Sequence, residues 1–167
     1  MILVLDNIRS CYNVGAILRT AEGFGVEKVI LSGYTPRVHD VNLLPHLREK
    51  LDREIHKTAL GAEEMLEIES CDDVLGRIDN LKRDGWQIVG LENNIDTERL
   101  VVLGSAAMRN ALREKVVLIL GEEVHGISRS LQDTIDLFVE IPMKGWKESF
   151  NVSVAAGIAM YGISTIV

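Results

Sequence analysis

Apolar and polar positions alternate along this chain in two kinds of block. Short apolar runs bounded by turn residues are typical of strands buried in a parallel sheet. Longer segments with an apolar residue at every third or fourth position are typical of helices packed on such a sheet. The short runs predict strands at Ile2–Leu5, Lys28–Leu31, Met65–Glu69, Trp86–Leu91, Lys115–Leu120 and Leu137–Ile141.

Helices are expected between these strands. Asn13 follows a polar loop and is placed to cap a first helix that runs through Phe24. The segment Glu92–Leu112 has no clear period. The alternation of strands and helices predicts one α/β domain, with a mostly parallel sheet of about six strands and helices on both faces. Further helical segments are predicted at Pro45–Leu60, Asp72–Asp84 and Ser128–Ile135.

The last predicted helix is apolar on nearly every side. Pro142 closes the strand before it, because proline lacks an N–H, and Ser149 or Asn151 is placed to cap the helix. A helix with so few polar positions must be buried on most sides, in the core or in an interface. At about 17 residues, with Ser153 and Ser164 inside it, the run is too short and too polar for a membrane span.

Composition is that of an ordinary globular protein. The 167 residues suit a single domain, with 47% apolar and 26% charged residues. Cys11 and Cys71 show no paired or metal-ligand spacing, which favours a reducing cytosol. The four histidines form no metal-like cluster, so no metal site is expected.

The charge is unevenly distributed. The net charge of −7 argues against a protein that binds nucleic acid through bulk positive charge. Residues 1–60, however, hold 8 Lys and Arg against 7 Asp and Glu. A local basic patch and a solvated face of mixed charge both explain this excess, and the sequence leaves the two open. The cations concerned are Arg37, Arg48, Lys50, Arg53 and Lys57.

Unusual polar and glycine residues collect where three predicted strands end. These junctions are Leu91–Asn93, Gly121–Gly126 and Ile141–Gly145. Ligands of open α/β sheets bind beyond the carboxyl ends of the strands, and glycines let a backbone approach a ligand closely. The glycine fingerprints of dinucleotide folds and of P-loops are missing. Taken alone, the second junction is explained by an ordinary acidic turn.

Three segments in order change that interpretation: NVGAILR at Asn13–Arg19, the G-x-E-x-x-G-I-S pattern at Gly121–Ser128, and IPM-x-G-x-x-x-S-x-N at Ile141–Asn151. Their strand–loop–helix context resembles the SPOUT superfamily of RNA methyltransferases, in particular the SpoU-like (TrmH-type) branch that methylates ribose 2′-hydroxyls. The third segment is the most specific. KTALGAEEML at Lys57–Leu66 also resembles this family, so the similarity spans almost the whole chain.

The resemblance implies a fold that periodicity does not predict. In this family the C-terminal part of the parallel sheet threads a loop to form a deep trefoil knot, a rare exception to unthreaded chain connections. The family also implies a homodimer, in which RNA-binding groups of one subunit meet the cofactor loops of the other. We expect residues 1–167 to form a single SPOUT domain, with no separate N-terminal RNA-binding domain.

The resemblance also implies a cofactor and a substrate. The cofactor is S-adenosylmethionine, and the acceptor is a ribose 2′-hydroxyl of tRNA or rRNA. A cytoplasmic enzyme is implied, without a membrane or DNA partner and without a metal. Main-chain contacts to the cofactor are expected from Leu91, Gly121, Ile141 and Met143. Phe150 stands where leucine is usual in the family and is expected near the adenine.

The implied catalytic residues are Arg19, Asn13, Glu123, Ser149 and Asn151. Because arginine stays protonated, we expect Arg19 to hold a phosphate and to stabilise developing alkoxide charge rather than to act as a base. Asn13 either orients Arg19 or RNA, or only caps its helix. Glu123 is expected to hold loop backbone or arginine, and the last two residues are expected to serve as helix caps and site groups.

Two other functions remain open. A catalytically silent RNA-binding or assembly protein of the same fold would bind RNA but not S-adenosylmethionine. An ordinary unknotted α/β methyltransferase would carry a glycine-rich loop after its first strand, and Ser10–Asn13 does not resemble one. Glu122 adds a negative charge where the family often has a neutral residue, which either favours a sulfonium or only faces water.

Overall fold

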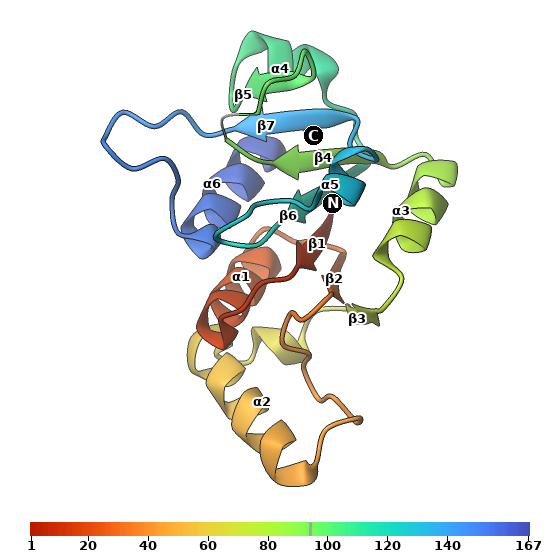
Figure 1. Ribbon diagram of the computed structural model, residues 1–167, viewed down its shortest axis with the longest axis vertical. Coiled ribbons are helices and arrows are strands. Elements are labelled where there is room, and N and C mark those ends of the chain that lie inside the picture. Colours follow the sequence, from red (N-terminus) through yellow and green to blue (C-terminus); the bar gives the residue numbers. More distant parts are fainter. Residues whose placement is uncertain (94) are drawn as a thin grey trace.

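The protein forms one sheet of parallel strands flanked by helices (Figure 1). The computed structural model describes residues 1–93 and 95–167. Within these residues the sheet has seven strands in the order β3-β2-β1-β6-β4-β7-β5. Their bounds are β1 Ile2–Asp6, β2 Lys28–Ser32, β3 Ile68–Cys71, β4 Gln87–Leu91, β5 Leu100–Val102, β6 Val116–Leu120 and β7 Leu137–Glu140.

Helices cover both faces of the sheet, as the sequence predicted. Figure 1 shows α1 and α6 on one side and α3 on the other. Alternate residues of β1 separate two apolar clusters: Leu3 and Leu5 pack toward α1 and α6, whereas Ile2 and Val4 pack toward α3 and α5. The helices are α1 Cys11–Gly23, α2 Pro45–Ala59, α3 Val74–Arg83, α4 Ala106–Ala111, α5 Arg129–Gln132 and α6 Val152–Ser164, with a 3₁₀ turn, η1, at Ala62–Glu64.

The central strands follow directly from their sequences. Every residue of β1 and β6 is buried, because both strands lie inside the sheet with helices on either face. All the strand pairs among the described residues are parallel, which confirms the predicted sheet type. The threading of the C-terminal segment through a knot stays a prediction, since strand order alone does not test it.

The sheet agrees with the predicted count of about six strands, and the further strand is the short edge strand β5 at Leu100–Val102, inside the segment without a clear period. Two other sequence predictions are wrong in detail. Strand β3 begins at Ile68, not at Met65, which is 75% exposed after the 3₁₀ turn. Ser10, rather than Asn13, caps α1, since its side chain accepts a hydrogen bond from the Asn13 N–H.

The C-terminal helix α6 is buried on one side only within this chain. Asn151 caps it, as predicted, by accepting a hydrogen bond from the Ser153 N–H. Ala156, Ala159, Met160 and Ile163 lie in the core, whereas Val154 and Tyr161 are exposed. None of the helices in the described residues is long and apolar enough to cross a bilayer.

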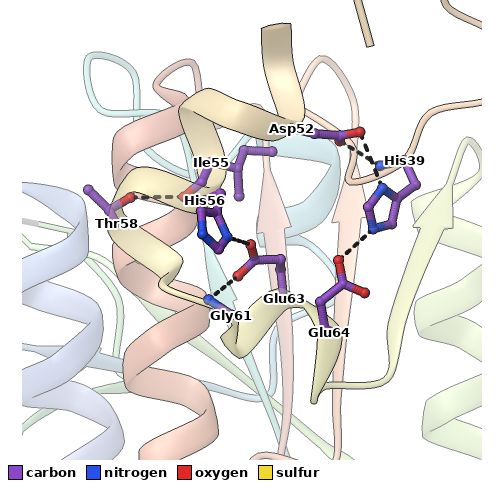
Figure 2. Close-up of polar contacts among 8 residues, drawn as sticks. All are labelled: His39, Asp52, Ile55, His56, Thr58, Gly61, Glu63 and Glu64. Carbon is purple, nitrogen blue, oxygen red and sulfur yellow. Dashed lines mark hydrogen bonds and ion pairs between the residues drawn. The ribbon is translucent and has the colours of Figure 1, made fainter. Parts of the chain in front are cut away.

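Helix α2 projects away from the sheet and packs on α1 (Figure 1). Figure 2 shows two histidines that contact carboxylates of α2 and of the 3₁₀ turn η1. His39 lies between two carboxylates, 3.2 Å from Asp52 on α2 and 2.9 Å from Glu64 on η1, while His56 Nδ1 lies 2.5 Å from Glu63 Oε1. A neutral imidazole donates from only one nitrogen, so paired carboxylates favour the charged ring. Glu64 and Asp52 accordingly raise the pKa of His39.

Candidate active site

A cavity of about 310 Å³ opens where β4, β6 and β7 end. The three loops that follow these adjacent strands form its walls, together with the start of α6. The convergence predicted for the three strand-to-loop junctions is therefore confirmed for all three. The lining residues are Leu91, Glu92, Asn93, Leu120, Gly121, Glu122, Glu123, Val124, His125, Gly126, Ile141, Glu148, Ser149, Phe150, Val152 and Ala155.

The loop after β6 closes on itself and needs glycine at both ends. Glu122 and Gly126 exchange two backbone hydrogen bonds, of 3.1 and 2.8 Å. A Cβ at Gly121 would overlap the backbone of Gly126 and Ile127. Gly126 has a φ of +68°, and a Cβ there would overlap the Glu92 carboxylate. These glycines therefore let the loop fold tightly against the end of β4.

Glu92 joins the loop after β4 to the loop after β6. One carboxylate oxygen accepts a hydrogen bond of 2.9 Å from the Ile127 N–H, and the other accepts one of 3.3 Å from the Asn93 N–H. Burial raises the pKa of the Glu92 carboxyl, because no cation among the described residues lies beside it to offset the loss of water. A partly buried carboxylate that lines a cavity is a candidate ligand for a cation.

Asn93 joins the loop after β4 to the loop after β7. Its amide nitrogen donates to the carbonyl oxygens of Ile141 and Glu148, at 3.1 and 3.2 Å. Its amide oxygen accepts a hydrogen bond of 3.1 Å from the Ile141 N–H. Sequence reasoning marked the Leu91–Asn93 junction but assigned no role to the side chains of Glu92 and Asn93. Their partners are backbone groups of distant loops, which no spacing in the sequence reveals.

The wall formed by the β6 loop is acidic. Glu122 pairs with Arg9 from the loop after β1, and its other oxygen lies 2.9 Å from His125 Nδ1. The His125 hydrogen bond, with the charge of Arg9, lowers the pKa of Glu122. Four glutamates line the cavity, at positions 92, 122, 123 and 148, with His125 as the one basic residue among the lining residues. The cavity therefore suits a ligand that carries positive charge.

Asn13 connects three elements at the rim of the cavity. Its amide nitrogen donates to Glu123 Oε1 at 3.0 Å, and its amide oxygen accepts from Asn151 Nδ2 at 3.2 Å. Because Asn151 also caps α6, this chain of bonds ties α1, the β6 loop and the start of α6 together. Asn13 is therefore not the cap of α1, and its side chain instead links these elements.

The structure brings most of the expected site residues to this cavity. Asn13 and Asn151 stand at its rim, and Met143 and Arg19 are not among the residues that line it. Arg19 is exposed on α1, where no ion pair joins it to another described residue. The expected residues that line the cavity are Leu91, Gly121, Glu123, Ile141, Ser149 and Phe150. Among the described residues, no group of three metal-ligating side chains comes together.

Known proteins share both the sequence and the fold. The chain is 32% identical over 163 residues to the 23S rRNA (guanosine-2′-O-)-methyltransferase RlmB of Coxiella burnetii, covering 98% of this chain and 57% of that protein. A TrmH/SpoU tRNA modifying enzyme of A. aeolicus superposes with a TM-score of 0.76 at 25% identity, covering 98% and 73%. An AdoMet-bound rRNA methyltransferase of Sinorhizobium meliloti shares the fold, with a TM-score of 0.78 at 22% identity, covering 98% and 55%.

One family profile matches nearly the whole of this chain. The chain spans little more than half of the RlmB relative. The profile of the SpoU rRNA Methylase family matches residues 1–161, from the first strand to within α6. This match shows that the chain, with its cavity at the ends of β4, β6 and β7, belongs to the SpoU rRNA methylase family.

Proposed function

We propose that this chain transfers a methyl group from S-adenosylmethionine to a ribose 2′-hydroxyl of tRNA or rRNA. The observation that carries the proposal is the convergence of three loops on one acidic cavity in a chain of this family. The named relatives divide between an rRNA and a tRNA enzyme, so both substrates stay in the proposal. A catalytically silent RNA-binding protein remains the alternative, separated from an enzyme by cofactor binding.

The cavity suits the cofactor in charge and in shape. S-adenosylmethionine supplies a methyl group carried on a positively charged sulfonium. Four glutamates in the wall favour such a cation, and Glu92 offers a partly buried carboxylate that has no cationic partner among the described residues. Gly121 lines the cavity beside Leu91 and Ile141. We assign the main-chain groups of these residues to the cofactor, with Phe150 at the adenine.

Holding the reacting groups in line is the main task of the protein in such a transfer. Correct alignment lowers the barrier by several kcal/mol, on the order of 7 or more in well-oriented reactions. Asn13, Glu123 and Asn151 form a bonded chain at the cavity rim, which fixes the groups nearest to the incoming ribose. Ser149 lines the cavity beside them and is assigned to the same edge.

Arg19 is assigned to the RNA. A guanidinium stays charged, so it holds a phosphate and stabilises negative charge on the attacking oxygen rather than accepting its proton. Since Arg19 does not line the cavity of its own chain, we propose that it acts at the cavity of a second copy. A homodimer is therefore part of the proposal, as are a single domain over residues 1–167, a cytoplasmic location and RNA rather than DNA as substrate.

An exposed apolar surface supports the homodimer. Phe24, immediately after α1, and Tyr161 on α6 pack together with ring centroids 6.3 Å apart, yet they remain 37% and 63% exposed. Val154, about two turns before Tyr161 on α6, is also exposed. Exposed aromatic groups at the meeting of two helices are typical of an interface. Light scattering at micromolar concentration is expected to give a dimer, and a monomer would contradict the shared site.

The proposed function is tested by methyl transfer to RNA. Protein and S-adenosylmethionine labelled in its methyl group are incubated with total RNA from cells that lack the gene. The RNA is then digested to nucleosides, and label is expected in 2′-O-methylated nucleosides. Label in a base, or binding of RNA without binding of the cofactor in calorimetry, would refute the proposal.

A further inference from the structure

An exposed tyrosine stands beside Asn13, outside the cavity. Tyr12 lies in the first turn of α1 and is 48% exposed. Lys57 of α2 places its ammonium 3.4 Å from the Tyr12 hydroxyl and 5.6 Å from the centre of the ring. The hydroxyl of Thr58 donates a hydrogen bond of 2.9 Å to the Tyr12 carbonyl oxygen. Tyr12 is therefore held from α2 at two points, its ring by Lys57 and its backbone by Thr58, although nearly half of its surface faces solvent.

A fixed and exposed aromatic ring offers a free face to a ligand. It contributes little to the core, because its surface stays in water. Because the ring is already held in place, less of its conformational entropy is lost when a partner stacks on it. Unpaired bases stack on such rings in proteins that bind single-stranded nucleic acid, and a cation beside the ring adds to the attraction.

The cations around Tyr12 form one stripe on α2. Lys50, Arg53 and Lys57 are three and four residues apart, so they share a helix face, and all three are exposed. Within the described chain, none of the three forms an ion pair. The charge excess of the first 60 residues thus includes a helix face with three cations and one acidic residue, Glu54, on a protein of net charge −7. Such a face suits a chain of phosphates.

Tyr12 also lies on the same side of α1 as Arg19. The two residues are seven positions apart, or about two helical turns, and both are exposed. We propose that Tyr12 is a stacking platform for an unpaired base of the RNA substrate, next to the target nucleotide, and that Lys50, Arg53 and Lys57 bind the adjoining phosphates. This inference rests on the proposed function, because it assigns the RNA to a surface of the same protein.

RNA fits this surface better than a second protein copy does. The apolar residues suited to a second copy, Phe24, Tyr161 and Val154, lie on α6 and at the end of α1. The surface at Tyr12 combines one ring with unpaired cations, which matches a base followed by phosphates. This surface suits unpaired rather than duplex RNA, because bases inside a helix are stacked on one another and do not offer a free face.

The test measures binding of a short fluorescein-labelled single-stranded RNA and of its duplex, without a methyl donor, over a range of salt concentrations. Tyr12→Leu is expected to weaken single-strand binding about five- to a hundred-fold and to leave both duplex affinity and the salt dependence unchanged. Tyr12→Phe keeps the ring and is expected to bind like the unaltered protein. Lys57→Ala is expected to reduce the salt slope by about 0.7, the value for one phosphate contact on a single strand.

Lys115→Ala is the matched control. Lys115 also lies over an aromatic ring, 5.7 Å from the centre of Trp86, but immediately before the central strand β6, at its amino end. It is expected to change neither affinity nor salt slope. A measurement without substitution accompanies these variants: RNA containing 4-thiouridine is expected to crosslink, under ultraviolet light, to the peptide that contains Tyr12.

Four results would overturn the proposal. They are unchanged single-strand affinity in Tyr12→Leu, an equal loss for single strand and duplex, crosslinks that avoid the Tyr12 peptide, or a loss explained by dissociation of the dimer in light scattering. Unaltered protein that binds no RNA would refute the proposed function together with this inference. Binding that is normal in every Tyr12 and Lys57 variant would refute this inference alone.

Discussion

Replacing Asn93 by alanine tests how the cavity is held together. The Asn93 side chain binds the backbone of the loop after β7 at three points, through the Ile141 N–H, the Ile141 carbonyl and the Glu148 carbonyl. The substitution removes these bonds without adding bulk. Because the side chain sits at the end of β4, the strand itself is expected to remain.

The size of the effect follows from these three bonds. The bond to Glu148 is exposed to solvent and contributes least, since water replaces it. The two bonds to the partly buried Ile141 backbone contribute about 1 kcal/mol each. Losing about 2 kcal/mol in favour of an open loop lowers the equilibrium constant for closing by roughly thirty-fold, and cofactor affinity falls by up to that factor.

Calorimetric titration with S-adenosylmethionine measures this loss. Asn80→Ala, which removes a surface amide paired with Arg83 on α3, is the matched control and is expected to bind normally. Asn93→Asp keeps an acceptor for the Ile141 N–H but places a carboxylate oxygen against the two carbonyl oxygens, whose repulsion should lower affinity at least as far as in Asn93→Ala. Cofactor affinity in Asn93→Ala equal to that of the unaltered protein would refute the role of this residue.

Three further predictions concern the loop after β6, Arg19 and His39. Gly121→Ala should abolish cofactor binding and lower the unfolding temperature, because its Cβ overlaps loop backbone. Gly145→Ala has open space and should change neither property. Equal unfolding temperatures for the two variants would contradict this prediction. Arg19→Ala should abolish methyl transfer to RNA with cofactor affinity retained, and residual transfer near the normal rate would remove Arg19 from the mechanism. Glu64 raises the pKa of His39, so the contribution of His39 to stability is full below its unfolded pKa of about 6.5 and is lost as pH rises through the higher folded pKa. Urea unfolding at several pH values should therefore show a smaller decline in the free energy of unfolding above neutrality in His39→Gln. Parallel pH curves for the two proteins would count against this contribution of His39.

The sequence was sufficient for the parts of the fold that depend on local pattern. The buried runs of β1 and β6 and the helix α1 are visible as apolar periodicity, because each buries a face along its whole length. The edge strand β5 was not, because three residues, two of them half-buried, leave no period to detect. The true cap of α1 was missed because Ser10 and Asn13 are both good caps, and only backbone geometry separates them.

The site was predictable as three loops but not as a network. Strand ends in a parallel sheet meet at one edge, so the junctions at Gly121 and Ile141 were expected to come together. The links between them depend on partners far apart in the chain. Asn93 and Ile141 are separated by 48 residues, and Asn13 and Asn151 by 138. Which side chain reaches which backbone group is decided by the packing of whole elements, and no sequence spacing encodes it.

Hydrogen exchange with and without S-adenosylmethionine tests the central claim most directly. The claim is that the loops after β4, β6 and β7 together bind the positively charged methyl donor. Adding the cofactor is expected to slow exchange in the segments at 91–93, 121–127 and 141–150 and to leave α3, on the other side of the sheet, unchanged. Protection confined to one of these loops, or protection elsewhere with all three unchanged, would contradict the account.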